Sequence, residues 1–383
     1  MEAYFDNSAT TRPSAPVRNL IQELLSDGWF NPSALYRPAM LIQKRLDDTR
    51  QICLEAAGAA GNRIIFTSGG TESDNLAILG TLKTRRPPGR VLISSIEHPA
   101  VSACADEIRK LGFSVEAIPV DSKARIDTAW LEKNMRGDVV LVAVMQVNNE
   151  TGTVQPLEEI AALRDRICPE AAIHVDGVQG FMRVPLSFNR LGIQSYAFSG
   201  HKIGGLKGTG ALIIRKGHRI KPLFYGGGQE NNDRSGTENT FGILSMGEAV
   251  RTYDTDANRR MNGIKTALWE RIITAVPGAE INGPECGSSE SAPHILNVSL
   301  MPVRSQTMLF ALEGDGIYVS AGSACASRKQ KISPVLKAMG LATDRADCSL
   351  RFSLSPETTP DEAEYAAERT AFHYNELKRY TRK

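Results

Sequence analysis

The chain has 383 residues, of which 42% are hydrophobic, and its 45 basic and 43 acidic side chains give a formal net charge of +2. This length suits roughly two domains of about 150 residues each. The small net charge argues against a nucleic-acid or membrane-surface partner, and no apolar run approaches the roughly 20 residues of a membrane-spanning helix.

The first 250 residues alternate helical and strand patterns. Apolar residues at helical spacing from Val17 to Leu25, just after Pro16, predict one helix, and the same spacing from Leu35 to Cys53 predicts a second. Short apolar runs then predict strands at residues 64–66, 91–93, 139–147, 172–175, 196–198 and 211–214. Nearly continuous apolar strands between helices indicate an α/β domain, with a mostly parallel sheet sandwiched by helices.

The composition changes after about residue 250. Residues 251–268 predict a polar, charged helix that bridges to a second domain, and strands are predicted at 294–300, 316–320 and 349–354. This is an α+β pattern. We therefore expect a large domain at residues 13–255 and a smaller one formed by residues 1–12 and 256–383.

The cysteines and the N-terminal residues bear on the cellular compartment. No two of the six cysteines form a CxxC pair, which argues against a metal site built from neighbouring ligands, and a chain of this length needs no disulfides. Residues 1–6 contain no basic segment followed by an apolar stretch, so we expect no signal peptide. We expect a cytoplasmic protein with free thiols.

Polar residues follow five of the predicted strands. Ligands of open α/β sheets bind beyond the carboxyl ends of the strands, so these residues are expected to share one crevice. They are Gly70 and Thr71 after the first strand, His98 after the second, Asn148 after the third, Asp176 and Gln179 after the fourth, and Ser199, His201 and Lys202 after the fifth.

Lys202 and Asp176 give this crevice its chemistry. A reactive lysine amine, with a carboxylate that keeps a ring nitrogen protonated, is what pyridoxal phosphate (PLP) requires of a protein. Gly70 and Thr71 open a helix whose N-terminus suits the phosphate, and Ser199 and His201 could add donors to it. Each residue alone has a commoner role, such as a helix cap, a structural histidine or a solvated lysine.

Three further side chains fit the same cofactor. His98 could stack on the ring and move protons near neutral pH. The amides of Asn148 and Gln179 could reach the phenolic oxygen of the ring, although either could equally be a hydrogen-bonding loop residue.

A second centre lies near the C-terminus. Cys325 has small residues on both sides and is followed by Arg328, Lys329 and Lys331, which would favour a thiolate. A buried structural cysteine is the alternative. Arg351 lies inside a strand pattern, where its guanidinium could clamp a substrate carboxylate or simply face solvent.

These residues lie in motifs that resemble those of cysteine desulfurases, in the class V aminotransferase-like, fold-type I PLP enzyme family. The resemblance covers essentially the whole chain and points to the subgroup with a Gly-Ser-Ala-Cys loop. The motifs, in order, lie at residues 4–11, 67–75, 97–98, 147–152, 174–176, 199–202, 234–237, 322–325 and 351–353.

The resemblance implies a role for each motif residue. Lys202 would carry PLP and move protons, His98 would stack on the ring, and Asp176 and Gln179 would contact N1 and the phenolic oxygen. The phosphate would be held by Gly70, Thr71, Ser199 and His201, and by Thr237 of a neighbouring subunit, which implies a homodimer with shared sites. Asn148, Arg351 and Asn7 would bind the substrate, and Cys325 would be the nucleophile.

The implied activity is removal of sulfur from L-cysteine, which gives L-alanine and a persulfide on Cys325. A sulfur-acceptor protein would then take the sulfur into iron–sulfur cluster, thio-cofactor or tRNA pathways. A selenocysteine lyase, or another aminotransferase or lyase of this fold, is the alternative. Beside the family pattern, Gln229 and residues 231–233 look atypical, and we expect the acceptor-docking extension that some relatives carry at the C-terminus to be short or absent.

Overall fold

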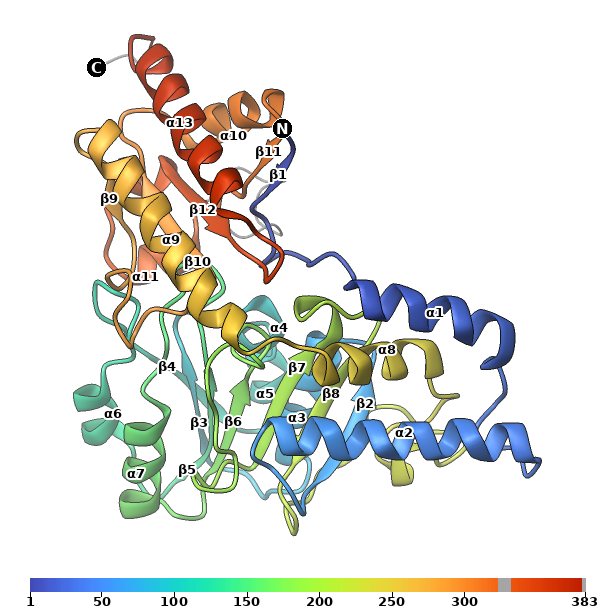
Figure 1. Ribbon diagram of the computed structural model, residues 1–383. Coiled ribbons are helices and arrows are strands. Elements are labelled where there is room, and N and C mark those ends of the chain that lie inside the picture. Colours follow the sequence, from blue (N-terminus) through green and yellow to red (C-terminus); the bar gives the residue numbers. More distant parts are fainter. Residues whose placement is uncertain (323–331, 381–383) are drawn as a thin grey trace.

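A seven-stranded sheet forms the centre of the larger of two bodies in the computed structural model, which describes residues 1–322 and 332–380 (Figure 1). The strand order is β2-β8-β7-β6-β5-β3-β4. All neighbours pair in parallel except β8, which runs antiparallel to β2 and β7, so the predicted mostly parallel sheet is confirmed. The strands are β2 (Arg63–Thr67), β3 (Arg90–Ser94), β4 (Ser114–Ile118), β5 (Val139–Met145), β6 (Ala172–Asp176), β7 (Ser195–Ser199) and β8 (Gly210–Ile214).

Helices cover both faces of this sheet, as the unbroken apolar strands require. One face packs on α1 (Ala15–Asp27), α2 (Arg37–Ala56), α6 (Thr128–Asn134), α7 (Leu157–Ile167) and α8 (Thr240–Arg251). The other face packs on α3 (Gly70–Leu82), α4 (Pro99–Ser102) and α5 (Ala105–Lys110). The result is a three-layer α/β/α sandwich, in which the helices cover the faces of the sheet and leave the strand ends available for a ligand site.

The smaller body joins the two ends of the chain. Ala3 and Phe5 are fully buried in the same core as side chains from residue 261 onward. Its sheets are the parallel pair β1 (Ala3–Tyr4) and β11 (Ile317–Tyr318), and the antiparallel set β12 (Ser349–Ser353), β10 (Ile295–Ser299) and β9 (Glu280–Ile281). Its helices are α9 (Asp256–Ala275), α10 (Ser305–Gly314), α11 (Pro334–Ala338), α12 (Thr343–Asp347) and α13 (Pro360–Leu377).

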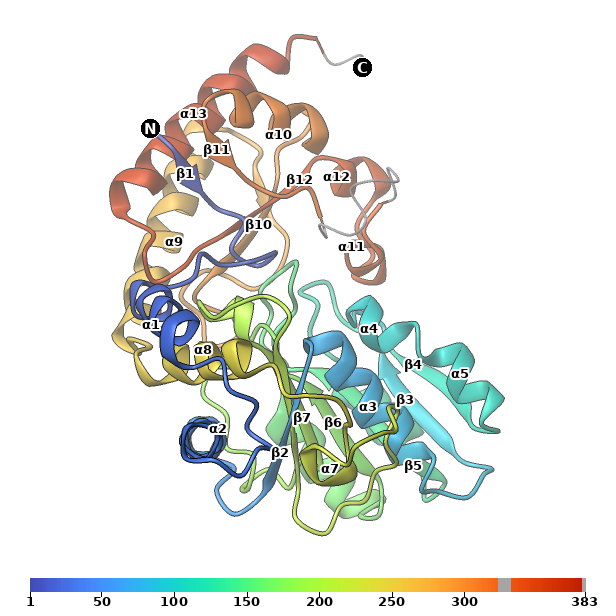
Figure 2. The same cartoon turned by 90° about the vertical axis from the view of Figure 1, so that its right-hand side faces the viewer.

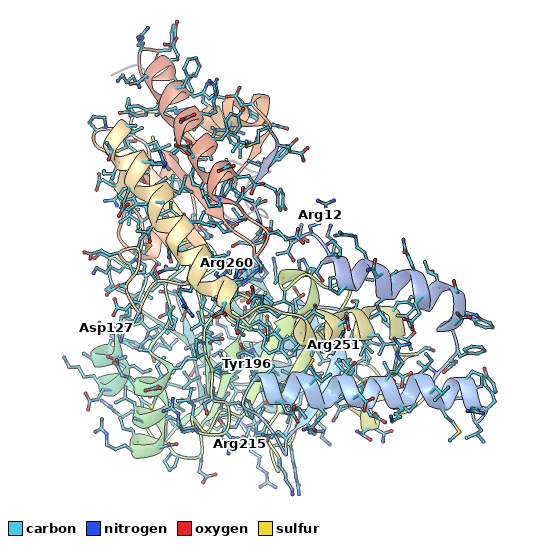
Figure 3. The ribbon with its side chains drawn as sticks, viewed as in Figure 1. Arg12, Asp127, Tyr196, Arg215, Arg251 and Arg260 are labelled. Carbon is cyan, nitrogen blue, oxygen red and sulfur yellow. The ribbon has the colours of Figure 1, made fainter. Side chains whose placement is uncertain are left out.

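The two bodies meet beside the strand ends. Figure 2 shows α11 facing α4 across the junction, where Val335, Leu336 and Met339 pack against Ile96 and Met145 of the larger body. Arg12 lies where the chain leaves the smaller body for α1 (Figure 3). Across the described ranges, no helix has the length and apolar character needed to cross a membrane.

Two predicted helices have different boundaries in the structure. The helix expected at 251–268 is wrong as one element, because α8 ends at Arg251 and α9 begins at Asp256; Arg251 and Arg260 lie on either side of this break in Figure 3. Leu35 precedes α2 and is 94% exposed, so it belongs to neither the helix nor the core. Helical spacing alone did not distinguish an exposed loop leucine from a core leucine.

Candidate active site

A pocket of about 320 Å³ lies at the carboxyl ends of the central strands. The predicted site residues that line it are Lys202, Asp176, His98, Gln179, Gly70, Thr71, Ser199, His201 and Arg351. A more open hollow of about 460 Å³ lies between β1, α10 and β11, and Asp6, Tyr4 and Tyr318 are among its lining residues. The smaller pocket is the chemically relevant one, because the strand-end side chains meet there.

Lys202 ends the short 3-10 helix η1 (Gly200–Lys202) that follows β7. Its Nζ donates to the carbonyl oxygens of Ser8 at 2.5 Å and Ala9 at 2.7 Å. Burial, followed by the positive charges of Arg351 and Arg183, lowers the pKa of Lys202 to about 7. A large share of the amine is therefore neutral at neutral pH, as a nucleophile or base requires.

Asp176 is the last residue of β6 and is 5% exposed. Its Oδ1 accepts a hydrogen bond from the Val178 N–H at 2.9 Å. Burial raises the pKa of Asp176, while His98, the Val178 N–H and Lys202 act in the opposite direction. A buried carboxylate is stabilised by a cation beside it, so this position suits a protonated ring nitrogen.

His98 caps the N-terminus of α4, and its Nδ1 accepts from the Ala100 N–H at 3.1 Å. Burial is the main cause that lowers the pKa of His98. The ring is therefore neutral near pH 7, and since Nδ1 is the acceptor, the proton is on Nε2. His98 is therefore a hydrogen-bond donor through Nε2, and its ring is held in place by the backbone at the start of α4.

The start of α3 forms one wall of the pocket, where Gly70 and Thr71 present the helix N-terminus. Gly210, which packs against the loop before α3, must also be a glycine, because a Cβ at this position would lie 2.5 Å from the carbonyl carbon of Gly69. Ser199 and His201 line the same pocket, and burial lowers the pKa of His201 to about 4, so its ring is neutral. Free N–H groups at a helix N-terminus favour an anion here.

Arg351 comes from β12 in the smaller body and is 2% exposed, so it is not a surface strand arginine. Its Nη2 donates to Asp6 Oδ1 at 2.6 Å and its Nη1 to the carbonyl oxygen of Asn149 at 2.9 Å. Its buried Nε has no partner within the described residues. The guanidinium is thus fixed at the pocket and retains donor capacity for an anionic ligand.

Three predicted residues lie outside the pocket lining. The Asn148 amide donates to Ile96 O at 3.1 Å, and its Oδ1 accepts from the N–H groups of Glu150 and Thr151, so this side chain holds the turn. Asn7 is buried and donates to the carbonyl oxygens of Tyr4 and Ser353. Thr237 is exposed. The roles predicted for Asn148, Asn7 and Thr237 stay predictions, and Cys325 lies outside the described residues.

Three residues that line the pocket or pair with a residue that lines it were missed from the sequence. Asn149 lines the pocket where Asn148 was expected, and Asp6 is the counter-ion of Arg351. Both lie in motifs of the resemblance, beside residues that were chosen, so strand-end position alone did not identify which neighbour faces the cavity. Asp74 also lines the pocket, and its Oδ1 lies 3.1 Å from His174 Nε2. Asp74 also lies in a motif of the resemblance, at residues 67–75, but its position inside a predicted helix gave no sign that it lines the pocket.

The segment at residues 229–233, which was expected to depart from the family pattern, is held by ion pairs. Glu230 forms a two-point pair with Arg50, at 2.6 and 2.7 Å, and accepts from the Phe66 N–H at 3.1 Å. Asp233 pairs with Arg63. Residues 230–232 all have left-handed φ angles, of 50°, 57° and 68°. The segment is therefore tied to the strand that leads into the Gly70 loop.

The residues of the pocket fit PLP. A lysine amine of lowered pKa, a buried carboxylate that forms no salt bridge with the described residues, and a helix N-terminus flanked by Ser199 and His201 match the aldehyde, ring nitrogen and phosphate of this cofactor. A volume of about 320 Å³ suits a ligand of this size.

The chain belongs to the aminotransferase class-V family, whose model matches residues 3–365. It is 34% identical to "Cysteine desulfurase IscS" of Dictyoglomus turgidum, over 95% of this chain and 92% of that one. Among solved structures it is similar to a "NifS-like protein", with a TM-score of 0.90, 31% identity, and coverage of 98% and 100%. It is also similar to "SspA in complex with cysteine", with a TM-score of 0.81, 30% identity, and coverage of 93% and 100%.

Proposed function

We propose that the chain is a PLP-dependent cysteine desulfurase, which converts L-cysteine to L-alanine and retains the sulfur as a persulfide on Cys325. The observation that carries the proposal is the pocket that brings Lys202, Asp176, His98 and Arg351 together. The names of relatives that align over nearly the whole chain support the same activity.

PLP would be held by Lys202 at its aldehyde carbon, by Asp176 at its ring nitrogen and by the N-terminus of α3 at its phosphate. When bound, it supplies an electron sink for the substrate carbon that loses a proton. The rest of the chemistry belongs to the chain. Arg351 holds the substrate carboxylate, and the free amine of Lys202 takes the proton from Cα and returns one to the carbon fragment.

Sulfur transfer needs a thiolate. The Cys325 sulfur attacks the substrate sulfur, the substrate Cβ–S bond breaks with its electron pair left on carbon, and protonation of that carbon completes alanine. Cysteine and a protein thiol thus give alanine and a protein persulfide without an external oxidant or reductant. None of the five described cysteines lines the pocket. Burial raises the pKa of Cys53 to about 12 and that of Cys104 to about 11, which makes both poor nucleophiles.

We also propose a homodimer with shared sites. Thr237 is exposed and away from its own pocket, which suits a residue that serves a second copy. The arm formed by α1 and α2 exposes a group of large apolar side chains that a partner subunit would cover. They are Leu25, Trp29, Leu35, Tyr36, Met40 and Leu41.

We propose cytoplasmic residence, in keeping with five described cysteines that are all free thiols, and a protein thiol as the sulfur acceptor, in an iron–sulfur or thiolation pathway. We propose domains at residues 13–255 and at 1–12 with 256–383. The separate apolar cores of the two bodies support that division.

The experiment that tests the function is incubation of the PLP-loaded chain with L-cysteine and a reductant, with alanine and sulfide measured in parallel. We expect equal amounts of both from the wild type and neither from Cys325→Ala, which should still bind PLP. Cys286→Ala is the matched control, because Cys286 is the one described cysteine that is not buried. Full alanine formation by Cys325→Ala would refute the persulfide and favour another lyase of this fold.

A further inference from the structure

Arg183 is a buried cation that forms no ion pair with a carboxylate of the described residues. It follows β6 in the turn after Gln179 and is 3% exposed. Within the described ranges, no carboxylate lies within 4.0 Å of its guanidinium, in contrast to Arg351, which has Asp6. A buried charge of this kind is far more costly than a neutral side chain of similar volume. Packing alone therefore does not explain why an arginine occupies position 183.

The guanidinium completes a ring of hydrogen bonds that includes the pocket residues Gln179 and Lys202. Its Nη1 donates to Gln179 Oε1 at 3.2 Å, and its Nη2 donates to the carbonyl oxygen of Lys202. Gln179 Nε2 and Lys202 Nζ both donate to the carbonyl oxygen of Ser8, at 3.0 and 2.5 Å. Arg183 and Ser8 thus each link Gln179 with Lys202, through separate hydrogen bonds.

This network extends away from the pocket. His294 Nε2 lies 3.2 Å from Gln179 Oε1, and the Tyr253 hydroxyl is a further partner of the guanidinium. Behind Lys202, a cavity of about 130 Å³ is lined by Arg183, Tyr253 and Lys202. This volume holds several water molecules. Water can therefore fill the space that a shorter side chain at position 183 would leave, so the site need not collapse.

The charge of Arg183 also acts on the lysine amine. The charged groups that face Lys202 are Arg351 from β12, Asp6 from the N-terminal segment, Asp176 from β6 and Arg183. The rings of His98 and His201 are neutral near pH 7. After burial and Arg351, Arg183 is the third cause that lowers the pKa of Lys202.

We propose that Arg183 is a positioning residue for the proposed reaction, which holds the Gln179 amide and the Lys202 backbone in fixed relation and keeps an unneutralised positive charge beside the lysine amine. The inference rests on the proposed function for the meaning of Lys202. The hydrogen-bond ring and the missing counter-ion do not depend on that function.

The test separates the charge of Arg183 from its geometry. In Arg183→Gln the charge is lost, and in Arg183→Lys the charge is kept but the two-point hydrogen bonding is lost. Arg164→Gln is the matched control, because Arg164 is also buried and bonded to carbonyl oxygens, those of Ala171 and Gly192, but lies outside the pocket.

The first readout is acetylation of Lys202 by acetic anhydride in the full chain without PLP, followed by mass spectrometry from pH 6 to 9. We expect a wild-type midpoint near 7. Arg183→Gln should label about threefold more slowly below its midpoint, which is the effect of half a pKa unit. Arg183→Lys and Arg164→Gln should label as the wild type does. Equal midpoints for the wild type and Arg183→Gln would overturn the electrostatic part.

The second readout is PLP affinity and kcat for alanine formation. We expect both Arg183 variants to bind PLP more weakly and to have a lower kcat, with Arg164→Gln unchanged. Unaltered PLP affinity and kcat in Arg183→Lys would overturn the positioning role, and this variant keeps the test valid if the glutamine variant does not fold. A wild type that forms no alanine would remove the proposed function, whereas the acetylation midpoints would still decide the effect of Arg183.

Discussion

Replacement of Arg351 by lysine tests how the pocket recognises its substrate. The wild-type guanidinium uses Nη2 for Asp6 and Nη1 for the carbonyl oxygen of Asn149, and the buried Nε has no partner within the described residues. A lysine ammonium at this position keeps a charge for Asp6 but not the planar fork. The substrate carboxylate would therefore lose at least one charge-assisted hydrogen bond.

The size of the effect follows from that bond. A hydrogen bond to a charged group contributes about 1.5–3 kcal/mol, so kcat/KM for L-cysteine should fall about 10- to 150-fold. The carboxylate is bound in both the ground and transition states, so most of the loss should appear in KM, with kcat changed much less.

The assay is the initial rate of alanine formation over a range of L-cysteine concentrations. Arg345→Lys is the matched control, since Arg345 also donates to a carboxylate and a carbonyl oxygen, those of Glu280 and Ile281, outside the pocket. Its KM should equal that of the wild type. A KM for Arg351→Lys within twofold of the wild type would show that Arg351 does not bind the carboxylate.

Two further predictions concern stability and cofactor binding. Burial raises the pKa of Glu97 from its ordinary value of 4.5 to about 8, so between these pH values the folded chain holds a proton that the unfolded chain has lost. The free energy of unfolding should therefore fall with rising pH, by up to about 1.4 kcal/mol per pH unit. Glu97→Gln should remove this slope in urea unfolding at pH 5.5 and 7.5, and an unchanged slope would contradict the assignment. Gly210→Ala should weaken PLP affinity at least about tenfold by displacing Gly69, whereas Gly263→Ala, where a Cβ meets nothing within 4 Å, should not. Equal PLP affinities in titration would refute the packing argument.

Strand positions were predictable because buried parallel strands are short apolar runs. β4 was missed because it is not such a run: it lies at the edge of the sheet, and its Glu116 forms an ion pair with Arg90. The strand-end rule located Lys202, Asp176 and His98, because the carboxyl ends of parallel strands meet at one edge. It did not distinguish Asn149 from Asn148, since which of two adjacent amides faces the cavity depends on the turn that Asn148 stabilises.

Arg183 was not predictable from the sequence. It has no carboxylate partner among the described residues, and it contacts Lys202 and Tyr253 on two other segments of the chain. Neither property is visible in a local sequence pattern. Asp6 was similarly hidden, because its partner is 345 residues further along the chain.

The joining of the chain ends in the smaller body has a consequence for biosynthesis. Ala3 pairs with Ile317, and Asn7 donates to the carbonyl oxygen of Ser353. At about 5–20 residues per second, a ribosome needs roughly 20–70 s to make the chain between the latter two. The first strand therefore emerges long before its partners exist, and Asp6 meets Arg351 only when synthesis is nearly complete. Under the proposed function, a nascent chain can build the cofactor pocket of the larger body well before Arg351 is in place to hold a substrate carboxylate.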